Sequence, residues 1–189
     1  MNDAELIHRT LRNPDDYVLI VERYQKQLLG FIRSLSQLSQ GDAEDIAQRV
    51  FLKAYDHLND FDTKLKLSTW LLRIARNEVI DFWRRKKVRP QEFPLEEGKS
   101  VAQSDEQTMA EQLDKKFTSQ RVQNILKLLK ARYREVLYLY YFENKSYDEI
   151  ADIIQCPPGT VAALISRAKK AFADVAVRTH QSQYFLPSL

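Results

Sequence analysis

The sequence predicts an all-α protein, with two small helical domains joined by a flexible acidic linker and a helix-turn-helix in the second domain. Four Gly and six Pro among 189 residues are too few for the turns of an all-β chain. Helix-favouring residues dominate, and apolar residues recur at steps of three or four. An acidic stretch with two prolines and no such period separates the two periodic halves.

We expect three helices in a first domain, residues 1–88. Asn13 followed by Pro14 has the form of a helix start, and one apolar stripe then runs to Leu35. Gly41 breaks the pattern, and we expect Asp42 to cap a second helix that ends near residue 58. After a polar loop at 59–67, a third helix should span about residues 68–87. Its predicted inward face is Trp70 or Leu71, with Ile74, Ala75, Val79 and Phe82.

The second domain, residues 119–177, follows a predicted linker at 89–118. We expect helices at about 122–129 and 132–142, of which the latter is more apolar all round. Ser146 and Glu149 have capping-box spacing at the start of a short helix. A turn at 155–159 leads into a final helix whose apolar residues run from Val161 to Phe172. Residues 178–189 are interpreted as a loose tail.

Several classes of protein are disfavoured by the composition. The single cysteine, Cys156, cannot form an internal disulfide, and three scattered histidines do not suggest a zinc site. The N-terminus has no signal core, and the longest apolar run, 136–142, is too short to span a bilayer. No phosphate-binding loop or nucleophile with a base is evident. We therefore expect a cytoplasmic, non-enzymatic protein without metal, cofactor or membrane insertion.

The charges are segregated along the chain. Residues 61–90 hold nine Lys and Arg against three Asp and Glu, and residues 120–189 hold ten against six. An acidic strip lies between these blocks. Concentrated basic blocks are typical of proteins that bind a polyanion.

The last forty residues carry the clearest functional pattern. A short capped helix, a tight turn and an amphipathic helix with basic residues near its end indicate a helix-turn-helix, whose second helix enters the major groove of DNA. A helical hairpin in an ordinary bundle is the alternative. Arg167 is the candidate for reading a guanine, and Lys169 and Lys170 for touching phosphate. The predicted DNA-facing set is Gly159, Thr160, Ala162, Ala163, Ser166, Arg167, Lys169 and Lys170.

A second block, residues 61–87, mixes basic and aromatic side chains. Such a mixture can hold a single strand, because charge follows the backbone while bases stack or enter pockets. Plain core roles for Trp70 and Phe82, and a solvated role for Asn77, remain open. A third segment, residues 42–55, turns Asp45, Gln48 and other polar residues outward. It is not basic, and periodicity alone favours a solvated face.

Together these segments resemble one family, the extracytoplasmic-function sigma factors, which are compact initiation subunits of bacterial RNA polymerase. The residues that carry the resemblance are DAEDIAQRVFLKAY at 42–55, STWLLRIARNEVIDFWRRKK at 68–87, and REVLYLYYFENKSYDEIADIIQCPPGTVAALISRAKKAF at 134–172. The resemblance covers nearly the whole chain except the linker and the tail. It implies three partners, namely core RNA polymerase (the clamp of its largest subunit and the flap of its second-largest), promoter DNA, and an anti-sigma factor.

The resemblance also implies roles for individual residues. Residues 42–55 would bind the polymerase clamp, where Arg49 replaces a common acidic residue. Residues 59–87 would recognise and open the minus-ten element, and residues 146–172 would read the minus-thirty-five element. Ala162 and Leu164 stand where basic residues are usual, so we expect weaker or altered minus-thirty-five recognition. The implied clamp contacts are Asp45, Gln48, Arg49, Phe51 and Lys53, and the implied minus-ten contacts are Lys64, Lys66, Ser68, Thr69, Trp70, Arg73, Arg76, Asn77, Arg84 and Arg85.

Two other functions remain open at this point. A helix-turn-helix regulator would bind an operator as a dimer without polymerase, although a second basic block argues against it. A helical adaptor that does not bind DNA would not need segregated charge. For a sigma factor, we expect the free chain to bind DNA poorly, because the flexible linker leaves its two DNA-binding surfaces unaligned.

Overall fold

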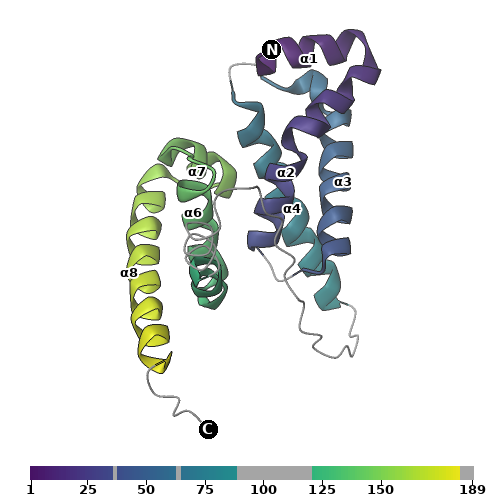
Figure 1. Cartoon of the computed structure of the whole chain (residues 1–189). Coiled ribbons are helices and arrows are strands. Elements are labelled where there is room, and N and C mark those ends of the chain that lie inside the picture. Colours follow the sequence, from purple (N-terminus) through teal and green to yellow (C-terminus); the bar gives the residue numbers. More distant parts are fainter. Residues whose placement is uncertain (36–37, 63–64, 89–120, 184–189) are drawn as a thin grey trace, which may run out of the picture.

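The computed structural model describes residues 1–35, 38–62, 65–88 and 121–183. Every regular element in these residues is a helix and none is a strand, so the all-α prediction is confirmed. The N-terminal elements are α1 (Asp3–Arg12), η1 (Pro14–Tyr17), α2 (Val18–Leu35), α3 (Gln40–Asp56), η2 (Leu58–Asp60) and α4 (Leu67–Val88). Residues 121–128 are helical and precede α6 (Ala131–Tyr141), α7 (Tyr147–Ile154) and α8 (Pro158–Gln183). Figure 1 shows these as two groups of helices.

The first helix, α1, was not predicted. Asn2 caps it, with a side chain that accepts a hydrogen bond from the Glu5 backbone, and Glu5 completes a capping box. Leu6 and Ile7 on its inner face are fully buried. Asn13 and Pro14 do start a helical segment, but it is the short 3-10 turn η1, and α2 follows from Val18.

The start of α3 differs from the prediction. Ser39 is the N-cap, and its hydroxyl accepts the Asp42 N–H at 3.1 Å. Asp42 therefore lies in the first turn, where its negative charge still suits the helix dipole. Gly41 is accommodated inside the helix rather than ending it.

Among the C-terminal helices, α7 begins where its cap predicted, whereas α8 begins inside the turn predicted at 155–159. The capping box of α7 is confirmed, because Ser146 Oγ accepts the Glu149 N–H while Glu149 Oε2 accepts the Ser146 N–H. Gln155 ends α7 in the left-handed conformation, with φ of 54°. Pro158 opens α8, which continues to Gln183. The expectation of a loose tail is thus wrong for residues 178–183, which are helical.

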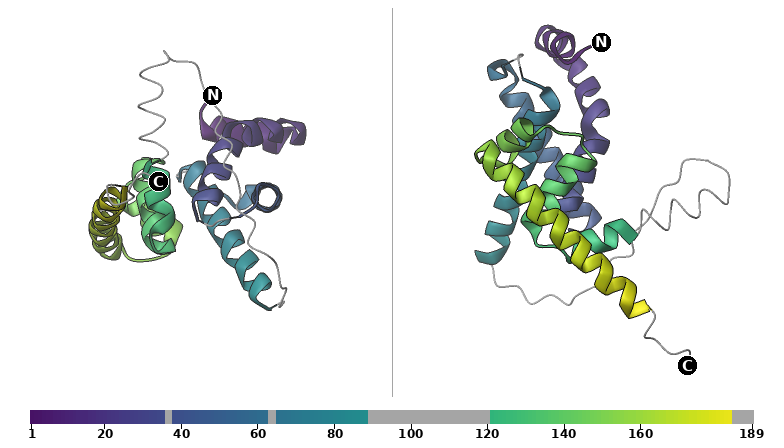
Figure 2. Two further views of the ribbon diagram at one scale, coloured as in Figure 1. Left: turned by 60° about the horizontal axis from the view of Figure 1, so that its bottom comes forward. Right: turned by 90° about the vertical axis from the view of Figure 1, so that its left-hand side faces the viewer.

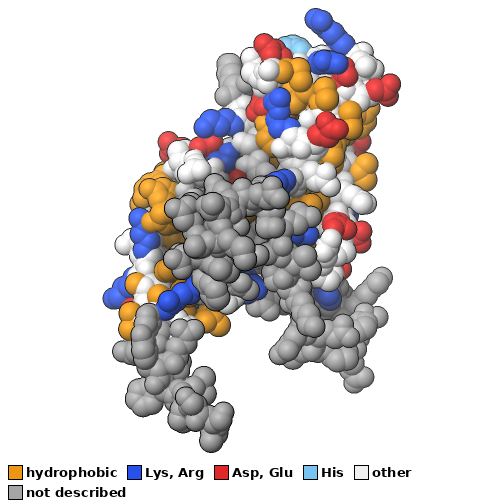
Figure 3. Space-filling view, viewed as in Figure 1, with side chains coloured by type: hydrophobic (Ala, Val, Ile, Leu, Met, Phe, Trp, Pro, Cys, Tyr) orange, Lys and Arg blue, Asp and Glu red, His pale blue; other side chains and the backbone are white. Residues whose placement is uncertain are grey.

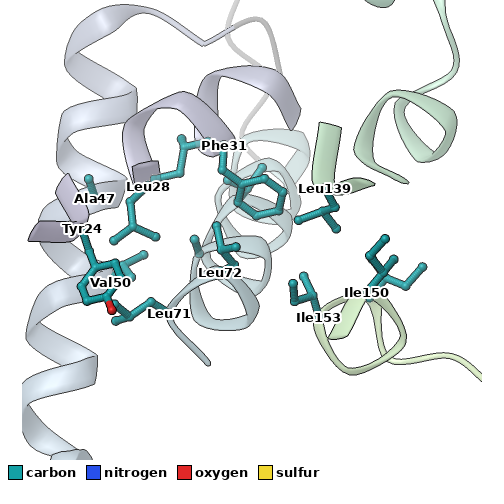
Figure 4. Close-up of a cluster of buried hydrophobic side chains, with 14 of the residues drawn as sticks. Tyr24, Leu28, Phe31, Ala47, Val50, Leu71, Leu72, Leu139, Ile150 and Ile153 are labelled. Carbon is teal, nitrogen blue, oxygen red and sulfur yellow. The ribbon is translucent and has the colours of Figure 1, made fainter. Parts of the chain in front are cut away.

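The two groups of helices pack directly against each other. α4 contacts α7 and α2 contacts α6, and Figures 1 and 2 show the two groups side by side. Phe31 and Leu72 from the N-terminal helices meet Leu139 and Ile153 from the C-terminal ones, so the core is continuous between the two (Figure 4). We call this packing the closed arrangement. It contradicts the expectation of two unaligned DNA-binding surfaces in the free chain.

A glycine lies at the tightest point of this packing. A Cβ added to Gly30 on α2 would lie 2.6 Å from the hydroxyl of Tyr138 on α6. The Tyr138 ring is held there by Phe31 at 6.1 Å and by stacking on Phe142 at 5.1 Å. The closed arrangement therefore depends on the missing side chain at position 30.

Candidate nucleic-acid and protein interfaces

The outer face of α3 carries the predicted clamp contacts. Asp45 and Gln48 are exposed, and Leu52, one turn beyond Gln48, is 65 % exposed. Leu52 was not among the predicted contacts, although it lies on the same outward stripe. Phe51 is a correction, because it is only 7 % exposed and packs in the core. Its side chain is therefore unavailable to a partner in this arrangement.

A buried carboxylate on α4 forms ion pairs with two basic residues of α3. Glu78 is 2 % exposed and forms ion pairs with Lys53 and with Arg49, whose Nε lies 3.7 Å from Glu78 Oε2. Arg85 approaches the same oxygen at 4.0 Å. The unusual arginine at position 49 thus has a partner inside the molecule. The sequence held one indication of this ion-pair site: the acidic residue Glu78 lies on the apolar stripe of α4, next to Val79.

The first half of α4 faces the C-terminal helices rather than solvent. Arg73 Nη1 donates to Asp152 Oδ1 of α7 at 2.8 Å, and Arg76 Nε donates to Glu135 Oε1 of α6 at 2.7 Å. Glu135 is 6 % exposed. Burial raises the pKa of Glu135, and the charge and hydrogen bond of Arg76 oppose that rise.

Glu149 divides its two carboxylate oxygens between two tasks. Oε2 caps α7 through the Ser146 N–H, while Oε1 accepts the Thr69 hydroxyl at 3.1 Å and lies 3.2 Å from the Lys66 ammonium. Burial alone would raise the pKa of Glu149. The Ser146 N–H, the hydrogen bonds from Lys66 and Thr69, and the charge of Lys145 outweigh burial and lower the pKa to about 2.

A buried lysine completes this contact. The Lys145 ammonium donates to Ser68 Oγ at 2.6 Å and to Thr69 Oγ1 at 3.2 Å. Burial lowers the pKa of Lys145, partly offset by the charge of Glu149. Neither Lys145 nor its contact with the start of α4 was predicted.

The remaining minus-ten candidates do not gather at this contact. Asn77 and Arg84 are exposed, and Arg84 pairs with Asp81 on its own helix at 3.1 Å. Trp70 is half-buried, with its ring 5.0 Å from that of Phe61. Lys64 lies outside the described residues.

The predicted reading face of α8 stays on the surface. Every member of that set is exposed except Ala163, which is half-buried. Lys169 lies over the rings of Tyr140 and Tyr141, at 5.3 and 5.5 Å, and a hydrogen bond with Tyr141 raises its pKa. Leu164 is buried, so this position belongs to the core rather than the DNA face. Lys and Arg side chains lie along α8 in Figure 3.

None of the described helices is long and apolar enough to cross a bilayer.

Comparisons with known proteins match both halves of the chain to one family. The sigma-70 region 2 model matches residues 20–89, and the sigma-70 region 4 model matches residues 119–172. The chain is 33 % identical to the RNA polymerase sigma-H factor of Pseudomonas aeruginosa over 180 residues, which cover 89 % of this chain and 91 % of that protein. It is 37 % identical to the ECF RNA polymerase sigma factor SigW of Bacillus subtilis over 141 residues, which cover 69 % and 73 %.

Among solved structures, the fold is similar to that of the sigma factor RpoE of Bartonella quintana, in its complex with the anti-sigma factor NepR. The TM-score is 0.68 at 25 % identity, covering 85 % of this chain and 96 % of that one. The chain therefore belongs to the sigma-70 family and is an extracytoplasmic-function sigma factor, which directs RNA polymerase to initiate transcription at particular promoters.

Proposed function

We propose that three helical faces divide the work of initiation. The outer face of α3 docks on the polymerase clamp, α4 captures the minus-ten element, and α8 reads the minus-thirty-five element while its domain rests on the flap. The observation that carries this assignment is the position of each face. α3 and α4 lie within the region 2 match, and the exposed residues of α8 at 159–170 lie within the region 4 match.

The α3 face suits a protein partner better than DNA. Asp45, Gln48 and Leu52 combine one negative charge, one amide and one exposed apolar side chain. Arg49 and Lys53 are partly neutralised by Glu78, so this face is less basic than the sequence suggests. Leu52 would supply the apolar contact, and the two polar residues would set its orientation.

The α4 face suits the phosphate backbone of a separated strand. Its arginines would contact phosphate oxygens, and Asn77 is exposed and able to hydrogen-bond a base edge. Trp70 is half-buried beside Phe61, so only part of its side chain would be available to an unstacked base. Trapping bases of one strand shifts the duplex toward its open form.

The α8 face suits duplex DNA. Arg167 can hold a guanine through two hydrogen bonds, and Lys169 and Lys170 can contact phosphate.

The chain itself would catalyse no reaction, since polymerase forms the phosphodiester bonds. It would work in the cytoplasm with promoter DNA. An anti-sigma factor is a further expected partner, because the similar RpoE is solved with one.

Reconstitution with core polymerase tests this assignment. We expect transcripts with defined 5′ ends from a pool of genomic fragments only when the chain is added. Arg167→Ala should weaken initiation about tenfold or more at promoters that depend on the minus-thirty-five element. Asp174→Ala, an exposed change farther along α8, is the matched control and should be silent. A chain that shifts duplex operator DNA without polymerase, and yields no transcripts, would instead be a regulator.

A further inference from the structure

Tyrosines of the C-terminal domain gather beside one lysine of α8. Tyr140 and Tyr141 are the last residues of α6, and Tyr147 is the first residue of α7. The ring centroid of Tyr140 lies 4.9 Å from that of Tyr141 and 5.7 Å from that of Tyr147. The Lys169 ammonium lies 5.3 Å from the centroid of Tyr140 and 5.5 Å from that of Tyr141, within the range of a cation–π interaction. We call Tyr140 and Tyr141 the tyrosine pair.

The turn between α6 and α7 creates this cluster. Asn144 adopts the left-handed conformation, with φ of 50°, which asparagine tolerates better than most residues. The chain turns back there, and the Lys145 N–H donates to the Leu139 carbonyl at 3.0 Å. The start of α7 therefore lies beside the end of α6. Because α8 contacts both helices, Lys169 can reach over the rings.

Lys169 keeps its positive charge available to a partner. Its side chain is exposed, and within the part of the chain that the structure describes no carboxylate forms an ion pair with it. The arginines Arg73 and Arg76 of α4, in contrast, are paired with carboxylates. Aromatic faces attract an ammonium group without neutralising it. The ammonium also has more N–H donors than two rings can take up, so a phosphate oxygen can still be bound.

The position of Lys169 on α8 places this charge on the predicted DNA face. Lys169 follows Ala162 by seven residues, or about two helical turns, so the two residues point to the same side of the helix. Both are exposed. Ala162 offers no charge to a phosphate, and Leu164 is buried in the core. Lys169 is therefore the residue through which this side of α8 can neutralise a phosphate.

We propose that the tyrosine pair positions Lys169 for minus-thirty-five DNA, as a preset phosphate contact on the side of α8 where Ala162 carries no charge. This inference rests on the proposed role of α8. A lysine loses side-chain entropy when it binds a phosphate, and the two rings have already restricted the Lys169 side chain before DNA arrives. The tyrosines are positioning residues, because they act through the lysine and read no base.

Promoter binding by the reconstituted holoenzyme tests this role. The probe is a fluorescent duplex that spans one promoter mapped by transcription with core polymerase, and its dissociation constant is measured over a range of salt concentrations. Lys169→Ala should weaken binding, and should reduce the slope of log affinity against log salt by about 0.9, the value for one phosphate contact. Lys127→Ala removes the same charge from an exposed site before α6, and should change neither quantity.

Substitutions of Tyr141 separate its ring from its hydroxyl. Tyr141→Leu removes the aromatic face and should weaken promoter binding about two- to fivefold. Tyr141→Phe keeps the face and should bind within about twofold of the wild type. In a Lys169→Ala background Tyr141→Leu should have no further effect, because the ring acts through the lysine. Tyr141 is 54 % exposed, so the core stays intact, and Tyr141→Met is used instead if the leucine variant has a lower melting temperature.

Each outcome bears on the proposal. Wild-type affinity for Tyr141→Leu would overturn it, as would an equal loss for Tyr141→Phe. A loss that persists in the Lys169→Ala background would also overturn it, since the tyrosine would then contact DNA itself. A duplex with a scrambled minus-thirty-five element is measured in parallel. If the wild-type holoenzyme binds that duplex as tightly as the intact promoter, the proposed role of α8 fails, whatever the tyrosine variants do.

Discussion

Adding one methyl group at Gly30 should open the molecule. In the Gly30→Ala variant the new Cβ would lie 2.6 Å from the Tyr138 hydroxyl, whereas ordinary contact begins near 3.4 Å, so the ring must move by about 0.8 Å. Phe31 and Phe142 pack on that ring and resist the movement. Overpacking of this kind costs about 1–3 kcal/mol.

The same substitution strengthens α2 itself. Alanine is favoured over glycine inside a helix by about 1 kcal/mol, in both the open and the closed arrangement. The steric cost exists only in the closed one. The variant should therefore shift the equilibrium toward open by a factor of about 5 to 150, while α2 becomes no less helical.

Solution scattering and polymerase binding report this shift. We expect a larger radius of gyration and a lower apparent dissociation constant for core polymerase, with a stronger effect for Gly30→Leu. Gly41→Ala is the matched control, because no atom lies within 4 Å of its added Cβ. If Gly30→Ala stays as compact as the wild type, or if Gly41→Ala expands equally, the closed packing does not depend on this close approach.

Three further predictions concern single side chains. Glu78→Ala removes the carboxylate shared by Arg49, Lys53 and Arg85. It should lower the free energy of unfolding, measured in a urea titration, by only about 1–2 kcal/mol, because the three cations left without a partner are half-exposed. The pKa of Glu149 is about 2, below its ordinary 4.5, so its stabilising contribution is full above about pH 4.5 and is lost as pH falls toward 2. The difference in melting temperature between wild type and Glu149→Gln should therefore shrink across that window, and a constant difference would contradict the assignment. Leu52→Ala should weaken binding to core polymerase several-fold without changing the melting temperature, because the side chain is 65 % exposed.

Local patterns in the sequence predicted most of the helices. The apolar stripes of α2, α4 and α8 and the capping box at Ser146 each depend on residues a few positions apart. α1 was missed because only Leu6 and Ile7 mark its inner face. The cap of α3 was predicted at Asp42 but is Ser39. The sequence could not decide between them, because both residue types can cap a helix and only its three-dimensional start settles the choice.

The contact between domains could not be predicted in the same way. Arg73 and Asp152 are 79 residues apart, and no periodicity connects them. One indication was present in α6, where apolar and aromatic residues from Val136 to Tyr141 occupy consecutive positions and so lie on more than one side of the helix. A helix of that kind must be covered on more than one side. α6 is covered by α8 on one side and by α2 on another, but the sequence did not identify the second cover.

The divided carboxylate of Glu149 constrains how this protein can evolve. One oxygen starts α7 and the other ties it to α4. A substitution that frees the start of α4 from this contact therefore also removes the cap of α7.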